Sequence, residues 1–119
     1  MIKSHHFSAI LTTDPAISDW TAVDFLTGLK TAVQASEMTI MGELAFEFAP
    51  QGVSAILLLA ESHVALHVWP EEGKVSIDIH VCDYQQDNQA KAAHLAQLLS
   101  LQISGSPNQD AWKYVSIAG

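Results

Sequence analysis

The sequence predicts one α+β domain, a two-layer sandwich in which an antiparallel sheet carries two helices on one face. Strand-like and helix-like segments follow one another in the order β-α-β-β-β-β-α-β. A hairpin with alternating apolar and polar residues occupies the middle of the chain. The length of 119 residues, 49% of them apolar, suits a single domain over 1–119.

The first segment, residues 6–13, has the pattern of a strand and is followed by a helix. Ser18 is the expected N-cap of this helix, because its hydroxyl can accept a backbone hydrogen bond. Apolar residues then recur at helical spacing and form a stripe that must cover the sheet: Trp20, Val23, Leu26, Leu29 and Val33.

Two further strands are expected after this helix, over residues 38–48 and 53–60. The second of them is apolar at almost every position. Such a strand is usually covered on both faces, so we expect it to be central in the sheet.

Residues 62–69 and 74–82 form the clearest hairpin, joined by the turn-rich tetrapeptide Pro-Glu-Glu-Gly. Side chains alternate along a strand, so a core set on one face is separated from a largely polar set on the other. The core set comprises Val64, Leu66, Val68, Val75, Ile77, Ile79 and Val81. The polar set comprises His63, Ala65, His67, Trp69, Ser76, Asp78, His80 and Cys82.

Two registers of this hairpin keep the polar faces together. Cys82 faces Glu61 in one register and His63 in the other. In both registers the only thiol of the chain lies beside the Glu61–Ser62 peptide bond, with His67 on the same face of the sheet.

A second amphipathic helix is expected over residues 90–101, followed by a break at 105–108 and a last strand over 112–117. The stripe of this helix contains Ala93, Leu95, Leu98 and Leu99. Three histidines outside the hairpin are expected to be ordinary surface or boundary residues: His5, His6 and His94.

Charge and cysteine content narrow the functional classes. Thirteen acidic residues against five basic ones give a net charge of −8, which disfavours nucleic acid and anionic lipid as partners and favours cationic ligands. The single Cys82 cannot form an internal disulfide, and we find no signal peptide. The longest apolar run, 55–60, is far shorter than the roughly 20 residues of a membrane span, so a cytoplasmic protein is expected.

Other chemistries agree less well with the geometry of the hairpin. His63 and His67 are about 13 Å apart on an extended strand, too far for one metal ion to bridge. Adding Cys82 or His80 makes a zinc site conceivable, but no known ligand spacing is present. Ser62 and His63 face opposite ways as strand neighbours, and a G-x-S-x-G elbow is absent, which argues against a serine hydrolase. Taken alone, a free cysteine is most often a small buried residue.

The hairpin and the strand before it resemble the bacterial and archaeal S-adenosylmethionine decarboxylase proenzymes. The resemblance rests on E-S-H at 61–63, H-V-W-P-E at 67–71 and Cys82, with further agreement over 52–54 and 59–60. The family pattern has E-S-H, then H-T-W-P-E, then a catalytic cysteine. This chain departs from it at Val68, where the family has threonine, and in the segment H-V-C-D at 80–83, where the family typically has F-T-C-G.

The resemblance implies that Ser62 is the precursor of a pyruvoyl group, the self-derived cofactor of the family. Its hydroxyl would attack the carbonyl of Glu61 and break the bond between them, giving a β chain of residues 1–61 and an α chain of residues 62–119. The substrate amine would then form a Schiff base with the pyruvoyl carbonyl. No metal and no pyridoxal phosphate are expected.

The resemblance also implies roles for other residues. Ser54 and His67 would assist processing, with His67 moving the proton, and Cys82 would protonate the substrate carbanion. The adenine and ribose of S-adenosylmethionine would contact three further residues: Phe48, Trp69 and Glu71. For the two aromatic residues the competing interpretation is core or dimer packing.

The resemblance implies that the protein decarboxylates S-adenosylmethionine to supply aminopropyl groups for spermidine. It also implies an S-adenosylmethionine decarboxylase-like fold and a homodimer whose active sites lie near the interface. Two alternatives remain open, a pyruvoyl-dependent arginine or ornithine decarboxylase and a non-processing homologue with a binding role. The acid at Asp83 could alter substrate preference or the protonation of the cysteine.

Overall fold

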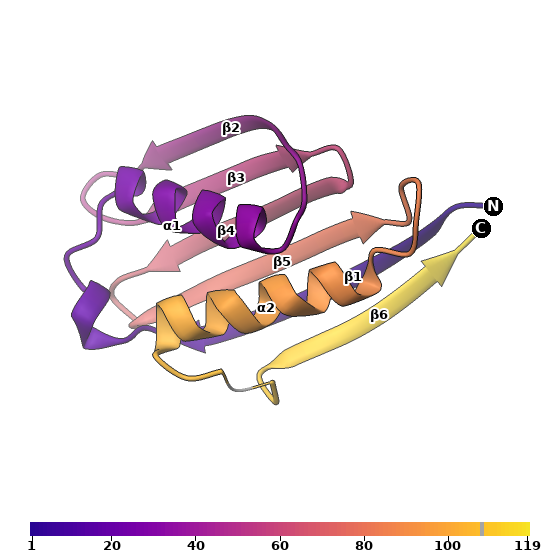
Figure 1. Ribbon diagram of the computed structural model, residues 1–119. Helices are drawn as coiled ribbons and strands as arrows, with labels where there is room; N and C mark the ends of the chain where they lie inside the picture. The colour runs from indigo at the N-terminus through magenta and orange to yellow at the C-terminus, as the bar shows by residue number, and fades with distance from the viewer. Residues whose placement is uncertain (108) are drawn as a thin grey trace.

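The computed structural model describes residues 1–107 and 109–119, which form one antiparallel six-stranded sheet with two helices packed on one face (Figure 1). The elements are β1 (Lys3–Thr12), the short 3-10 helix η1 (Pro15–Ile17), α1 (Ala22–Ala35), β2 (Ile40–Glu47), β3 (Val53–Leu59), β4 (Ser62–Trp69), β5 (Lys74–Cys82), α2 (Gln89–Ser104) and β6 (Trp112–Ala118). The strand order is β2-β3-β4-β5-β1-β6. The predicted fold class is therefore confirmed.

The first helix begins later than the sequence pattern indicated. Thr21 is the N-cap of α1 and forms a capping box with Asp24, in which each side chain accepts a hydrogen bond from the backbone N–H of the other. The prediction of Ser18 as the N-cap is wrong, because Asp14 caps η1 first and Ser18 ends that short helix.

This later start rotates the buried face of α1. Val23, which the predicted stripe included, is 70% exposed. The buried face instead consists of Ala22, Phe25, Leu29, Ala32 and Val33. The second helix, α2, buries Ala92, Leu95, Ala96, Leu99, Ser100 and Ile103, and ends at Gly105, whose φ of 75° requires a left-handed backbone. The predicted break at 105–108 thus begins at Gly105, while residue 108 lies outside the described residues.

The core lies between the helices and the face of the sheet that they cover, which we call the inner face. The opposite, outer face carries no helix in Figure 1. The expectation that the strand over 53–60 is covered on both sides is wrong for the single protomer, since Leu58 is 56% exposed on the outer face. Other exposed apolar residues of the outer face are Ile10, Leu44, Phe46, Ile56, Val115 and Ile117.

The central hairpin of β4 and β5 has the first of the two predicted registers. Trp69 pairs with Lys74 and Ser62 with Val81, so Cys82 stands opposite Glu61. The two faces are as predicted, because the core set of β5 is buried while His80 and Cys82 lie on the outer face. Neither long helix in the described ranges has the length and apolar character needed to cross a membrane.

Candidate active site

The bond between Glu61 and Ser62 lies where the chain leaves a tight turn and enters β4. Ser62 has a φ of 140°, a region that residues with a side chain rarely occupy. Such a conformation costs on the order of 1–3 kcal/mol and persists only where the surroundings impose it. The surroundings are tight here: the Glu61 side chain is buried, and its Oε1 accepts a hydrogen bond from the backbone N–H of Thr39 at 3.0 Å.

Cys82 contacts the same peptide bond through its backbone. Its backbone N–H donates to the carbonyl oxygen of Glu61 at 2.8 Å. That carbonyl is the one that the Ser62 hydroxyl would attack, so a hydrogen-bond donor is already in place where negative charge would develop. The thiol is free and half-buried on the outer face. We call Glu61, Ser62 and Cys82 the cleavage group.

A second set of predicted site residues lies at the far end of the hairpin. Ser54 and His67 face each other across β3 and β4, with the hydroxyl oxygen 2.7 Å from Nδ1 of the imidazole. They line a cavity of about 360 Å³ together with the three residues predicted to bind substrate, Phe48, Trp69 and Glu71. Glu71 also accepts a hydrogen bond from the Gln51 side chain at 3.1 Å. We call Phe48, Ser54, His67, Trp69 and Glu71 the pocket group.

The two groups are separated within the protomer. His67 follows Ser62 by five residues on β4, which corresponds to about 17 Å along an extended strand. The structure therefore brings Cys82 next to the Glu61–Ser62 bond, as the periodicity predicted, but it does not bring His67 there.

A family model described as S-adenosylmethionine decarboxylase matches residues 15–104. The chain belongs to this family. The S-adenosylmethionine decarboxylase proenzyme of Parasynechococcus marenigrum is 37% identical over 94 residues, which make up 77% of this chain and 72% of that relative. The proenzyme of Symbiobacterium thermophilum is 39% identical over 67 residues, about half of its own length at 51%.

A solved structure of the family supports the fold independently. The crystal structure of the adenosylmethionine decarboxylase from Aquifex aeolicus matches 98% of this chain and 88% of that chain with a TM-score of 0.76. At 22% sequence identity this likeness concerns the fold alone.

One departure from the decarboxylase pattern, His80, creates a row of imidazoles on the outer face. The ring centroid of His80 lies 4.2 Å from that of His6 and 5.0 Å from that of His63. Burial lowers the pKa of His80, and the neighbouring His6 and His63 lower it further. His6, expected to be an ordinary surface or boundary residue, lies directly opposite His80 through the pairing of β1 with β5.

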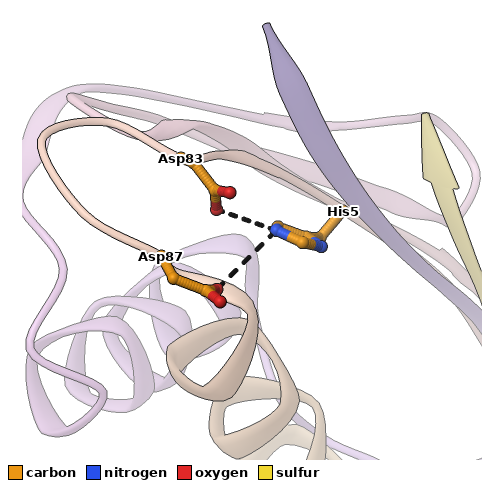
Figure 2. A group of neighbouring side chains, drawn as sticks. All are labelled: His5, Asp83 and Asp87. Carbon is orange, nitrogen blue, oxygen red and sulfur yellow. Dashed lines mark hydrogen bonds and ion pairs between the residues drawn. The ribbon is translucent and has the colours of Figure 1, made fainter. Parts of the chain in front are cut away.

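The other departure, Asp83, is turned toward a buried histidine (Figure 2). Nε2 of His5 lies 2.8 Å from Oδ1 of Asp83 and 3.9 Å from Oδ1 of Asp87. The expectation that His5 is a surface or boundary residue is wrong, because it is fully buried on the inner face. The alternation of His5 with Phe7, Ala9 and Leu11 along β1 was the signal that could have revealed this.

These three side chains, His5, Asp83 and Asp87, place one possible ligand atom each within 4.8 Å of one another. The backbone N–H of Asn88 lowers the pKa of Asp83 most, and the hydrogen bond and charge of His5 lower it further. The recorded hydrogen bonds of the Asp83 carboxylate go to His5 and Asn88. The absence of a metal from this protein stays a prediction.

Proposed function

We propose that this protein is an S-adenosylmethionine decarboxylase that forms its own pyruvoyl group by breaking the chain between Glu61 and Ser62, which leaves chains of residues 1–61 and 62–119. The observation that carries this proposal is the geometry of the cleavage group. The backbone at Ser62 is strained, and the carbonyl of Glu61 accepts a hydrogen bond from the backbone N–H of Cys82.

The proposed cleavage begins when Oγ of Ser62 attacks the carbonyl carbon of Glu61. The C–N bond breaks and an ester forms, while the Cys82 N–H stabilises the negative charge on the carbonyl oxygen. Elimination then releases the Glu61 carboxylate and leaves dehydroalanine at position 62, which takes up water and loses ammonia to give the pyruvoyl group. Breaking the chain also relieves the strained φ of Ser62.

Once formed, the pyruvoyl group supplies a carbonyl that holds the substrate amine and withdraws the electrons released with carbon dioxide. The cleavage group fits such a group through its backbone, because Ser62 pairs with Val81 and Cys82 therefore stands opposite Glu61, with its N–H on the Glu61 carbonyl. The thiol is the proposed donor of the proton that replaces the lost carboxylate.

The pocket group suits the proposed substrate. Phe48 and Trp69 are each about half exposed, so their rings are free to contact an adenine or a sulfonium ion. Glu71 lines the same cavity and offers carboxylate oxygens to the ribose hydroxyls. The net charge of −8 favours a substrate that carries positive charge.

We further propose that the active enzyme is a homodimer in which the outer faces of two protomers meet. The exposed apolar residues of the outer faces would be buried by such contact. The separation of about 17 Å between Ser62 and His67 leaves each protomer with two incomplete halves of a site. A two-fold axis places the same surface of both copies in contact. The pocket group of each protomer would then lie beside the cleavage group of its partner, which gives two equivalent complete sites.

The substrate assignment is tested with the purified protein. We expect intact-mass measurement to find two chains separated before residue 62, the second beginning with pyruvoyl, and carboxyl-labelled S-adenosylmethionine to release labelled carbon dioxide. Labelled arginine and ornithine serve as parallel substrates. Release of labelled carbon dioxide from these amino acids alone would contradict the assignment of S-adenosylmethionine as the substrate. A chain that stays intact through prolonged incubation would favour a binding role.

Co-expression of two defective variants tests the shared site. Neither Ser62→Ala nor His67→Ala is expected to be cleaved when expressed alone. In a mixed dimer the His67→Ala protomer keeps its own serine and receives the imidazole of its partner, so it should be cleaved. With equal amounts and random pairing, about half of the His67→Ala chains should be processed, as measured by mass spectrometry. If none is processed, the site is not shared between protomers.

A further inference from the structure

A hydrogen-bonded chain centred on the buried His5 links three parts of the fold that are far apart in the sequence. His5 of β1 has both ring nitrogens occupied: Nδ1 lies 2.7 Å from the hydroxyl of Tyr114 on β6, and Nε2 lies 2.8 Å from the Asp83 carboxylate. The His5 side chain is 0% exposed and that of Asp83 is 25% exposed. Because the imidazole of His5 is fully buried, removing the Asp83 carboxylate would leave Nε2 of His5 without this partner.

Asp83 continues this chain to the segment that carries the thiol. Its Oδ1 also accepts the backbone N–H of Asn88 at 3.0 Å, and the Asn88 side chain donates to the carbonyl oxygen of Cys82 at 3.0 Å. The backbone N–H of Asp83 donates to the carbonyl of Lys3 at 3.0 Å. Cys82 is thus fixed on its carbonyl side by Asn88 and on its amide side by the Glu61 carbonyl.

We propose that His5 and Asp83 are positioning residues that hold the backbone of Cys82 against the Glu61 carbonyl. The inference rests on the proposed function for its effect on cleavage, but the position of the Cys82 amide can be measured without it. Asp83 stands where the pattern that the chain resembles typically has glycine, which has no side chain to make this contact. The acid at this position thereby acts through the backbone of the neighbouring cysteine.

The charges around the contact are consistent with an ionised Asp83. The Asn88 N–H and His5 hold the pKa of Asp83 below its ordinary value, with a smaller effect from Lys3. Asp87 faces the same imidazole at 3.9 Å from the adjoining loop, as Figure 2 shows. Tyr114 approaches the imidazole from the other side with its hydroxyl.

Asp83→Ala removes the carboxylate from a partly exposed position and is the main test. We expect self-cleavage to slow about tenfold and, in the uncleaved Ser62→Ala background, hydrogen exchange of the Cys82 amide to accelerate about tenfold. The amide of Ile77, in the middle of β5, should keep its protection. Asp83→Asn keeps an acceptor oxygen and should recover most of both effects, which a role in general stability would not produce.

A double-mutant cycle with His5→Phe shows whether the two residues act as a unit. The double variant should be cleaved no more slowly than the slower single variant, because the second change removes a contact that is already lost. His94→Ala, on the exposed side of α2, is the matched control and should leave both measurements unchanged. Circular dichroism establishes that each variant is folded.

The two hypotheses fail in different ways. If the unaltered protein is never cleaved, the proposed function is wrong, and the amide exchange of Cys82 alone decides the positioning role. If the unaltered protein is cleaved but folded Asp83→Ala matches it in cleavage rate and in amide exchange, the positioning role is wrong and the proposed function stands.

Discussion

An alanine at position 62 is expected to leave the protein as one uncleaved chain of 119 residues without decarboxylase activity. The hydroxyl of Ser62 is the attacking group, and Cα and Cβ of the same residue become the ketone carbon and the methyl group of the pyruvoyl group, so no other side chain can replace it. Intact mass after prolonged incubation measures cleavage, and labelled carbon dioxide measures turnover. We expect turnover to fall by at least about a thousandfold.

Thr31→Ala provides the matched control for this experiment. Thr31 is exposed on α1 and donates its hydroxyl to the carbonyl oxygen of Thr27 at 3.0 Å, away from the outer face, the cleavage group and the pocket group. Its loss should leave cleavage unchanged. Normal splitting of the Ser62→Ala variant between residues 61 and 62 would contradict self-cleavage by the serine.

Cys82→Ala is expected to separate cleavage from turnover. The contact of Cys82 with the scissile carbonyl is made by its backbone N–H, which alanine retains, so cleavage should proceed at nearly the normal rate. Turnover should fall by about 10²–10⁴-fold, the usual effect of losing a positioned proton donor. Both rates are measured on the same preparation, with turnover divided by the cleaved fraction.

Cys82→Ser is the companion variant, since a hydroxyl at the same place is a weaker acid than a thiol and should restore only part of the lost turnover. If Cys82→Ala loses cleavage and turnover in equal proportion, the thiol has no separate part in the decarboxylation. Unchanged turnover of folded, cleaved Cys82→Ala would assign the proton to another group.

The hairpin of β4 and β5 could be predicted from the sequence because its alternation leaves few choices. Once Trp69 faces Lys74, Cys82 must stand opposite Glu61. The start of α1 could not be fixed in the same way, because Ser18 and Thr21 both have the side chain of an N-cap. Asp14 and the short helix η1 decide between them, and their hydrogen bonds appear only in three dimensions.

The candidate site was predicted in its residues more fully than in its arrangement. The residues of the pocket group lie together because neighbouring strands carry them. His67 and Ser62 are close in the sequence motif, but the extended strand between them keeps them apart in space. The alternation along β1 could have revealed the burial of His5, but its hydrogen-bond partners, Asp83 and Tyr114, lie 78 and 109 residues away along the chain. Local pattern carries no information on such distant partners.

The opposite positions of Ser62 and His67 along β4 have a consequence for the life of the protein in the cell. In the proposed dimer the site is divided between two copies, so a newly synthesised polypeptide would remain dormant until it met a second one. Maturation would then depend on the square of the concentration of unpaired precursors at low abundance. Diluting freshly made precursor would delay its cleavage, whereas protein that has already been cleaved would not be affected in this way.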